Sequence, residues 1–430
     1  MNNRDELRQQ ISEAIRTYCE AEHNYVFSAS DPIVRLHEPT FSAEEIDAAL
    51  DCLLTTRVTM GQKVKTFEMA FSASGPFGPG VMVNSGSSAN LLAIAALANP
   101  EARDALQPGD EVIVPALSWS TTVWPLIQLG LVPVVVDIDP ATLNIDPNEI
   151  EAAITEKTRG VMIVHVYGNP CDLEAILDIC NRHSLILVED CCEALGAKYD
   201  DKAVGSFGRM GTYSFYFSHH ITTLEGGITV AQTQDDAELM RILRAHGWIR
   251  EVEDQKSWIE RYPDIHPRFL FVNLGYNLRA TELQGAMGSV QLPKLPSYVE
   301  ARRQNAEKLV SQLKANEPLL RTQTTTPQGE HSWFGFPITL GIDAPFSVDD
   351  IMTALGDFGI ETRPIICGNI ARQPGLKLYP HRTQGDLTHA SAVMERGFSF
   401  GNHQDIDNAA RDHILGAIEM FLANKGVLSA

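Results

Sequence analysis

Residues 160–190 read GVMIVHVYGNPCDLEAILDICNRHSLILVED. The apolar runs at 160–165 and 185–190 are short and resemble buried strands, whereas residues 173–183 have the apolar spacing of a helix. Strands that alternate with helices in this way predict a mainly parallel sheet covered by helices. This stretch therefore places the chain in the α/β class.

The same alternation continues toward the N-terminus. Further strands are expected at 81–84, 111–115 and 132–137, and further helices at 90–97, 121–129 and 148–155. An amphipathic helix is expected at 3–22, and Ser42 with Glu45 forms a capping-box signature for a helix that ends near Leu54.

The C-terminal part has a different pattern. A polar insert at 251–267 precedes a long helical region at 279–313. Beyond residue 317, a strand at 333–340 and helices at 348–358 and 406–422 indicate a smaller α+β domain. A chain of 430 residues is too long for one compact core. We expect an N-terminal helix and extended arm (1–40), a large α/β domain (41–300) and a small C-terminal domain (301–430).

Composition excludes several classes of function. The net charge of −21 argues against nucleic-acid binding, which needs clustered Lys and Arg. No apolar run reaches the roughly 18 residues that cross a bilayer, and the acidic N-terminus lacks the apolar core of a secretory signal. The cytoplasm is therefore the expected location. Seven cysteines without regular spacing do not resemble a disulfide framework.

Ligands of parallel sheets bind at the carboxyl ends of the strands, where three stretches stand out. In the first, Gly86, Ser87 and Ser88 open a helix whose free N–H groups suit a phosphate, although helix capping alone also explains such residues. In the second, Asp190 ends a strand. It either caps the next segment or keeps a pyridine nitrogen protonated. The third stretch reads SFYFSHHITTLEGG, residues 214–227.

These three stretches in this order resemble the DegT/DnrJ/EryC1/StrS family of sugar aminotransferases and dehydratases. The resemblance implies fold-type I, the aspartate aminotransferase-like fold of pyridoxal phosphate (PLP) enzymes, with a mainly parallel seven-stranded sheet. In that family the residue five after Ser214 and 29 after Asp190 is the lysine that binds PLP covalently. Here that residue is His219, and no lysine occurs between Lys202 and Lys256.

The histidine indicates the His-bearing branch, the 3-dehydratases that remove the C3 hydroxyl of CDP- or GDP-linked 4-keto-6-deoxyhexoses. These enzymes use non-covalent pyridoxamine phosphate (PMP), whose own amine condenses with the ketone, and the imidazole is a suitable base. Iron–sulfur members carry a cysteine two after the strand-end Asp, as Cys192 is here, but the further cysteines they need are missing before Cys367. We therefore expect no cluster and no other metal, and a glutamate-type amino donor that regenerates PMP.

The resemblance also assigns roles to single residues. Ser87, Ser88 and Ser214 are expected to contact the cofactor phosphate, Asp190 the pyridine nitrogen, and Trp119 the ring face. Glu193 replaces the usual Gln or His near the ring hydroxyl. Asn277 is expected to reach the phosphate of the neighbouring subunit, which makes a homodimer with shared active sites the working unit. Weaker candidates for contact with the sugar nucleotide are Tyr167, Asn169, His220, Arg363 and Arg372.

Two other functions stay open at this point. One is a PMP-dependent aminotransferase or dehydratase that acts on a different keto compound. The other is a catalytically inactive relative that binds the cofactor only. The base of the nucleotide, the hexose and any partner reductase are also open.

Overall fold

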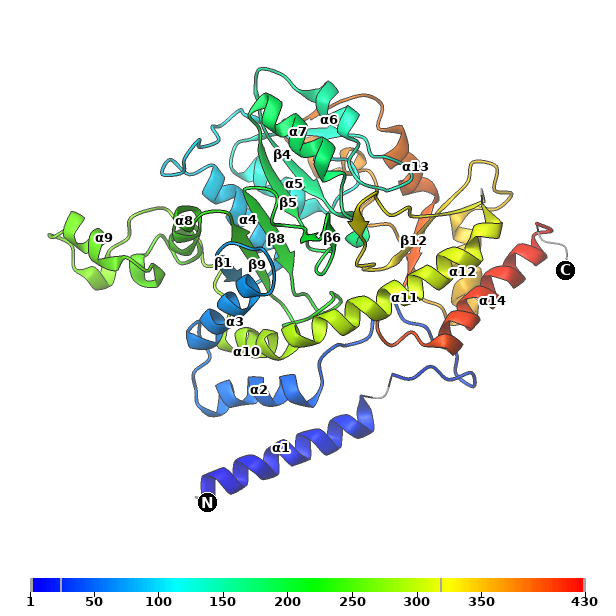
Figure 1. Ribbon diagram of the computed structural model, residues 1–430, viewed down its shortest axis with the longest axis horizontal. Coiled ribbons are helices and arrows are strands. Elements are labelled where there is room, and N and C mark those ends of the chain that lie inside the picture. Colours follow the sequence, from blue (N-terminus) through cyan, green and yellow to red (C-terminus); the bar gives the residue numbers. More distant parts are fainter. Residues whose placement is uncertain (1–2, 24, 318, 428–430) are drawn as a thin grey trace.

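The computed structural model describes residues 3–23, 25–317 and 319–427. An eight-stranded sheet in the order β1-β9-β8-β5-β4-β2-β3-β14 forms its centre, with helices packed on both faces (Figure 1). Side chains that alternate along each strand enter two separate cores. Val81 and Val83 of β1 pack in one core, and Met82 between them packs in the other.

Every neighbouring pair in this sheet is parallel except the two that involve β9. The seven longer strands match the expected number, but the eighth, β14, was not foreseen. It contributes only two residues, which pair with Val134 and Val135, too few for a periodic signal. The strands are β1 (Gly80–Val83), β2 (Glu111–Pro115), β3 (Val132–Val136), β4 (Thr158–Val164), β5 (Ile186–Asp190), β8 (Met210–Ser214), β9 (Gly227–Ala231) and β14 (Arg382–Thr383).

The four helices between β1 and β5 lie close to their expected positions, whereas no prediction was made for α8, which follows β9. The one clear difference is α4, which begins four residues early because Ser85, and not a later residue, caps it: the Ser85 hydroxyl accepts a hydrogen bond from Ser88 N–H. These helices are α4 (Gly86–Leu97), α5 (Ser120–Gln128), α6 (Pro147–Ala153), α7 (Leu173–His183) and α8 (Gln234–Arg244).

The long helical region expected at 279–313 is two helices, α10 (Glu282–Gln291) and α11 (Leu295–Leu313). A short 3-10 turn at Leu292–Lys294 separates them, where Pro293 and Pro296 cannot donate backbone hydrogen bonds. The polar insert before them contains a helix of its own, α9 (Gln255–Arg261), at the left of Figure 1.

The small domain is built on a four-stranded antiparallel sheet in the order β10-β12-β15-β13. The expected domain limits at residues 40 and 300 stay a prediction; α11 runs through residue 300, and Val34 of the arm packs in the core of this domain. The elements of the small domain are β10 (Leu320–Thr322), β12 (Phe336–Leu340), α12 (Val348–Asp357), β13 (Thr362–Pro364), α13 (Thr388–Arg396), β15 (Gly397–Phe400) and α14 (Asn408–Asn424). A separate three-stranded sheet consists of β6 (Lys198–Tyr199), β7 (Lys202–Ala203) and β11 (Gly329–Glu330).

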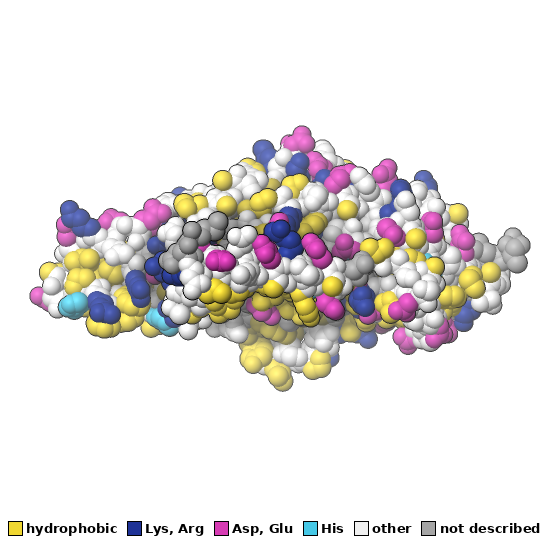
Figure 2. Space-filling view, turned by 90° about the horizontal axis from the view of Figure 1, so that it is seen from below, with side chains coloured by type: hydrophobic (Ala, Val, Ile, Leu, Met, Phe, Trp, Pro, Cys, Tyr) yellow, Lys and Arg dark blue, Asp and Glu magenta, His cyan; other side chains and the backbone are white. Residues whose placement is uncertain are grey.

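The N-terminal helices are α1 (Asn3–Glu22), α2 (Ala43–Leu54) and α3 (Gln62–Ala73). The predicted capping box of α2 is confirmed, with Ser42 N–H donating to the Glu45 carboxylate at 2.9 Å. Arg8 joins α1 to α2 through ion pairs with Asp47 and Asp51. On the face formed by these helices, basic side chains lie dispersed among acidic ones (Figure 2). None of the described helices is both long enough and apolar enough to cross a membrane.

Candidate active site

The three sequence stretches meet at the carboxyl edge of the large sheet. Strand β8 lies beside β5, and β9 joins β8 to β1, so that the ends of these strands share one edge. The contact is close: a Cβ atom on Gly86 would lie 2.5 Å from Ser214 Cβ and 3.1 Å from Cys192 Sγ. Only glycine fits at position 86, where the first turn of α4 passes over Ser214.

The start of α4 offers backbone N–H groups and one outward hydroxyl. Ser87 is exposed, and its hydroxyl donates to Thr121 at 3.2 Å. The hydroxyl of Ser88 differs from what the sequence suggested, because it already donates to Asn84 Oδ1 at 2.6 Å. Both hydroxyls therefore donate within the protein, Ser88 over the shorter distance, and the expected phosphate contacts of Ser87 and Ser88 stay predictions. The backbone N–H groups of the helix N-terminus, whose partial positive charge favours a phosphate, remain available to an anion.

Gly86→Ala should weaken cofactor binding and lower stability, because the added methyl group collides with Ser214. Overpacking of this kind costs about 1–3 kcal/mol. The matched control is Gly416→Ala in α14, where nothing lies within 4 Å of the added Cβ. The control should be neutral or slightly stabilising. Thermal unfolding with and without added PLP measures both effects. Equal stabilisation by PLP in the two variants would contradict a cofactor role for this turn.

Asp190 is buried, and three donors orient its carboxylate. Asn90 Nδ2 and Thr122 Oγ1 each donate to Oδ2 at 2.8 Å, and Cys192 N–H donates to Oδ1 at 3.1 Å. Sequence reasoning missed Asn90 and Thr122. Both are polar residues in the first half of helices that follow strand ends, α4 and α5, and that position was the available signal.

Trp119 precedes α5 and is 56% exposed, which is unusual for so large an apolar side chain. Thr122, one turn later, binds Asp190, so the tryptophan stands at the same edge of the sheet as the aspartate. An exposed indole at the mouth of a site is suited to stacking on a planar ring.

His219 lies in the loop after β8, with its Nδ1 atom enclosed and without a hydrogen-bond partner in the described part of the chain. The Phe334 ring lies against the imidazole, with 5.0 Å between the ring centroids. Loss of hydration lowers the pKa of His219 to about 3, and the charges of Arg363 and Arg302 act in the same direction. The imidazole is therefore neutral at physiological pH.

Glu193, Tyr167 and Arg363 form a polar group on the side of the small domain. Glu193 accepts a hydrogen bond from the Tyr167 N–H at 2.9 Å. Burial raises the pKa of Glu193 to about 7, against the opposing effect of the Arg363 charge. The hydroxyl of Tyr167 donates to Ser399 at 2.7 Å, so this side chain joins the two domains.

The Glu193 carboxyl should make stability depend on pH. Its pKa in the folded chain lies above the value of 4.5 for an ordinary glutamate, so its favourable contribution is complete below pH 4.5 and is lost as pH rises through about 7. Glu193→Gln removes this dependence. We expect the melting temperature of the cofactor-free wild type to fall relative to that of the variant between pH 4.5 and 7.5, by about 3 °C. Parallel curves for the two proteins would show that Glu193 titrates normally.

Several sequence candidates lie elsewhere. The Asn169 amide is saturated by backbone partners, because it donates to Thr142 O and Thr324 O and accepts from Thr326 N–H. Arg372 is half-exposed and pairs with Glu395 at 2.5 Å. Each side chain is engaged in a structural contact, and its expected role in binding the sugar nucleotide stays a prediction.

His220 and Asn277 also differ from simple expectation. His220 is buried and bonds to Ser332 O at 3.0 Å, which is a structural link to the small domain. Asn277 is exposed, and its Oδ1 accepts from Arg279 at 3.0 Å. The segment that carries Asn277 runs beside the end of β1, because Asn84 N–H donates to Leu278 O. Its expected contact with a neighbouring subunit stays a prediction.

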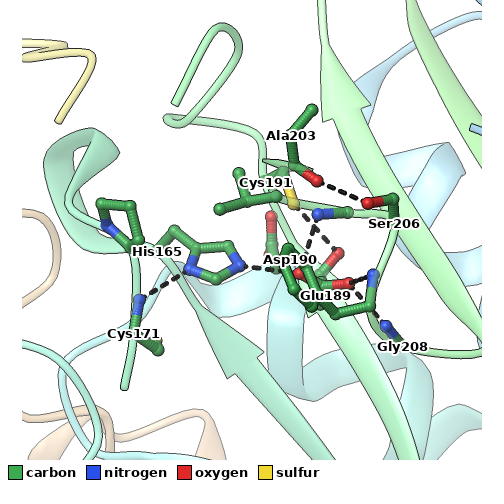
Figure 3. Close-up of polar contacts among 12 residues, drawn as sticks. His165, Cys171, Glu189, Asp190, Cys191, Ala203, Ser206 and Gly208 are labelled. Carbon is green, nitrogen blue, oxygen red and sulfur yellow. Dashed lines mark hydrogen bonds and ion pairs between the residues drawn. The ribbon is translucent and has the colours of Figure 1, made fainter. Parts of the chain in front are cut away.

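A buried network supports the strand ends from behind (Figure 3). His165 Nδ1 accepts from Cys171 N–H, so the neutral ring carries its proton on Nε2 and donates it to Glu189 at 3.1 Å. Glu189 also accepts from three backbone N–H groups of the loop before β8: Gly205, Phe207 and Gly208. Although His165, Glu189 and Cys191 lie close enough to share a metal ion, the first two are satisfied as a hydrogen-bonded pair.

This edge of the sheet fits a vitamin B6 cofactor. The strand ends here carry an oriented, buried carboxylate (Asp190), a tight glycine turn at a helix N-terminus (Gly86) and an exposed indole (Trp119). The loop after β8 adds an imidazole, His219, whose Nδ1 has no partner among the described residues. Fold and site together define a B6-dependent enzyme of the aspartate aminotransferase type.

The chain belongs to the DegT/DnrJ/EryC1/StrS aminotransferase family, whose model matches residues 39–419. It is 40% identical to GDP-4-keto-6-deoxy-D-mannose 3-dehydratase of Yersinia pseudotuberculosis over 86% of this chain and 94% of that protein. A crystal structure of a mutant GDP-4-keto-6-deoxymannose 3-dehydratase with bound GDP-perosamine has 37% identity and a TM-score of 0.84, and covers 89% of this chain and 100% of that one. A structure of that enzyme with a trapped PLP-glutamate geminal diamine has 37% identity and a TM-score of 0.82, over 90% and 100% of the two chains.

Proposed function

We propose that this protein is a PMP-dependent 3-dehydratase that removes the C3 hydroxyl of a GDP-linked 4-keto-6-deoxyhexose. The observation that carries the proposal is a neutral imidazole, His219, where related aminotransferases have the lysine that holds PLP. The nearest lysines in the sequence on the N-terminal side, Lys198 and Lys202, lie in β6 and β7, and Lys198 pairs with Glu330 of β11. They do not replace the missing amine.

When bound, PMP supplies an amine for the keto group and a ring that takes up electrons. The chain supplies the remaining functions. His219 would take a proton from C4′ of the cofactor, since its imidazole is neutral and its Nδ1 has no hydrogen-bond partner among the described residues. Asp190 would keep the ring nitrogen protonated, and the start of α4 would hold the phosphate. None of these roles needs a covalent link to the protein, which is why histidine suffices at position 219.

Two features support the choice of substrates. A GDP-sugar is bound in one of the related structures, and glutamate is trapped on PLP in another. The overlap with each structure covers about nine tenths of this chain. We therefore propose a GDP-sugar and glutamate as the ligands of this chain as well. Glutamate is the proposed amino donor that returns PLP to PMP. The absence of an iron–sulfur cluster stays a prediction that rests on the cysteine pattern.

We also propose a homodimer. Apolar side chains are exposed on α1, α2 and α3, among them Leu7, Leu53, Leu54 and Met69, all about half exposed or more. Figure 2 shows apolar side chains gathered in the lower part of this face. Exposed patches of this kind mark contact surfaces. Asn277 is also exposed, so its side chain is available to a second subunit.

The test uses purified protein with PMP, glutamate and GDP-4-keto-6-deoxymannose. We expect the C3 hydroxyl to be replaced by hydrogen, detected by mass spectrometry as a net loss of one oxygen atom from the released sugar. Repeated turnover should depend on glutamate, because each cycle consumes the amine and two electrons of PMP, releases ammonia and leaves PLP. The CDP-linked sugar serves as the matched comparison for the nucleotide. Unchanged substrate with either nucleotide would overturn the proposal.

A further inference from the structure

The imidazole of His219 has an unusual environment for a base. Catalytic histidines are commonly oriented by a hydrogen bond from one ring nitrogen to a carboxylate or carbonyl. Here Nδ1 is buried and unpaired among the described residues. Its orientation must therefore come from packing.

Two aromatic rings contact this imidazole. Tyr216 meets it edge-on, with 6.0 Å between centroids, but Tyr216 is 46% exposed. Phe334 meets it at 5.0 Å with an interplanar angle of 55°, and Phe334 is only 8% exposed. The same ring also lies 5.9 Å from the ring of His220. Phe334 is thus the enclosed, and more strongly fixed, of the two neighbours.

The backbone of Phe334 is held on both sides. Its N–H donates to Tyr167 O at 2.8 Å, which belongs to the large domain. Its carbonyl accepts from Arg302 Nη1 at 2.9 Å. Asn402 holds the preceding residue, donating to Trp333 O at 3.2 Å. Trp333 has a φ of +48°, a conformation that a non-glycine residue keeps only where its surroundings enforce it.

Arg302 is a buried cation without a carboxylate partner in the described part of the chain. It is 2% exposed, and its guanidinium bonds the carbonyls of Phe334, Trp333 and Asn402. Burying a charge is costly unless it is well hydrogen-bonded, so an arginine that binds only carbonyls is expensive as a purely structural device. Positive charge faces His219 from three elements: Arg302 on α11, Arg363 on β13 and, when it is protonated, His37 in the N-terminal arm. All three favour the neutral imidazole.

We propose that Phe334 is a positioning residue for the base: its ring sets the orientation of the His219 imidazole and shields it from water, and Arg302 fixes Phe334 in place. The importance of this contact for catalysis rests on the proposed function, whereas its geometry does not depend on that proposal. Without the Phe334 ring, the imidazole has no hydrogen bond at Nδ1 among the described residues, and of the two aromatic neighbours only the half-exposed Tyr216 remains.

The test compares Phe334→Leu with Phe336→Leu. Phe336 lies two residues away in β12, is fully buried, and stacks on Trp333 and Phe400. Both changes remove one ring and keep an apolar side chain, so both should lower the melting temperature. Only Phe334→Leu should affect the imidazole. Arg302→Met is a second variant, for which Arg303→Met, a neighbour that binds His331 O, is the control.

The first measurement is NMR of ¹³C-labelled histidine in the cofactor-free protein, with His219 assigned by its loss in His219→Asn. In wild type and Phe336→Leu we expect one sharp signal that does not titrate between pH 5 and 8. In Phe334→Leu the signal should broaden, and its pKa should rise toward the ordinary value because water reaches the ring. The second measurement is the rate at which glutamate converts bound PLP to PMP. We expect it to fall 10- to 100-fold in Phe334→Leu, with the half-saturating glutamate concentration changed less than threefold, and to stay within threefold of wild type in Phe336→Leu.

The outcomes are separable. If Phe334→Leu leaves both the His219 signal and the rate unchanged, Phe334 is an ordinary core residue and the inference is wrong. If the signal changes as expected but the wild type processes no GDP-sugar, the positioning of His219 stands and the proposed function fails. Equal effects of Phe334→Leu and Phe336→Leu on the His219 signal would also overturn the inference, because the effect would then reflect general loosening of the small domain.

Discussion

His219→Lys is expected to abolish dehydration and to create a covalent link to PLP. A lysine at this position brings a primary amine to the place where related aminotransferases bind the coenzyme, and an amine condenses with the aldehyde of PLP. Loss of a general base alone slows a reaction roughly 10²–10⁴-fold, and a lysine occupied by PLP also prevents free exchange of PMP. The measurement is mass spectrometry after borohydride reduction, which should show one phosphopyridoxyl group per chain, located at residue 219.

The matched control is His219→Asn, which removes the base without adding an amine. It should lose dehydration to a similar degree and bind PLP without a reducible link. His220 offers a second comparison, since this neighbour is buried and bonds Ser332 O. His220→Lys is expected to destabilise the fold and to gain no link. Labelling at another lysine of His219→Lys, or in the wild type, would show that residue 219 does not face the cofactor.

The large domain could be predicted well because its signals are local. Strand and helix periodicities in residues 80–190 correspond to β1 to β5 and to the helices between them, with ends shifted by few residues. The capping box at Ser42 was visible for the same reason, since both partners lie three residues apart. What periodicity does not report is pairing over long sequence distances. The strand β14 lies beside β3 although about 250 residues separate them, and only two residues of it pair.

The site shows the same division. Asp190, Gly86 and Ser214 could be proposed as site residues because each stands in a recognisable motif at a strand end. Asn90 and Thr122, which orient Asp190, could not, because an isolated polar residue in a helix has no fixed spacing to the strand it serves. Ser88 has the right sequence context, but its hydroxyl proton is used within its own turn. Phe334 is about 115 residues from the histidine that it contacts, and no local pattern joins them.

Asp190→Asn is expected to reduce dehydration strongly while leaving the fold almost intact. The amide nearly matches the carboxylate in shape, and one of its atoms still accepts hydrogen bonds. It does not, however, hold a proton on the pyridine nitrogen. A hydrogen bond between charged groups contributes about 1.5–3 kcal/mol. Loss of the charged contact between Asp190 and the pyridine nitrogen, in the step in which the ring takes up electrons, therefore predicts a fall of roughly 10- to 150-fold in kcat. Steady-state kinetics at saturating PMP measures the effect.

The control for this prediction is Thr122→Val, which removes one of the donors that orient the carboxylate but keeps its charge. It leaves Asn90 and the Cys192 N–H in place, so Asp190 should keep most of its effect on the ring, and the rate should fall by about tenfold or less. The difference between the two variants separates charge from orientation. Charge dominates if Asp190→Asn is much slower than Thr122→Val at equal cofactor occupancy. Equal rates in Asp190→Asn and wild type would mean that the pyridine nitrogen binds elsewhere, and the assignment of this edge of the sheet to the cofactor would fail with it.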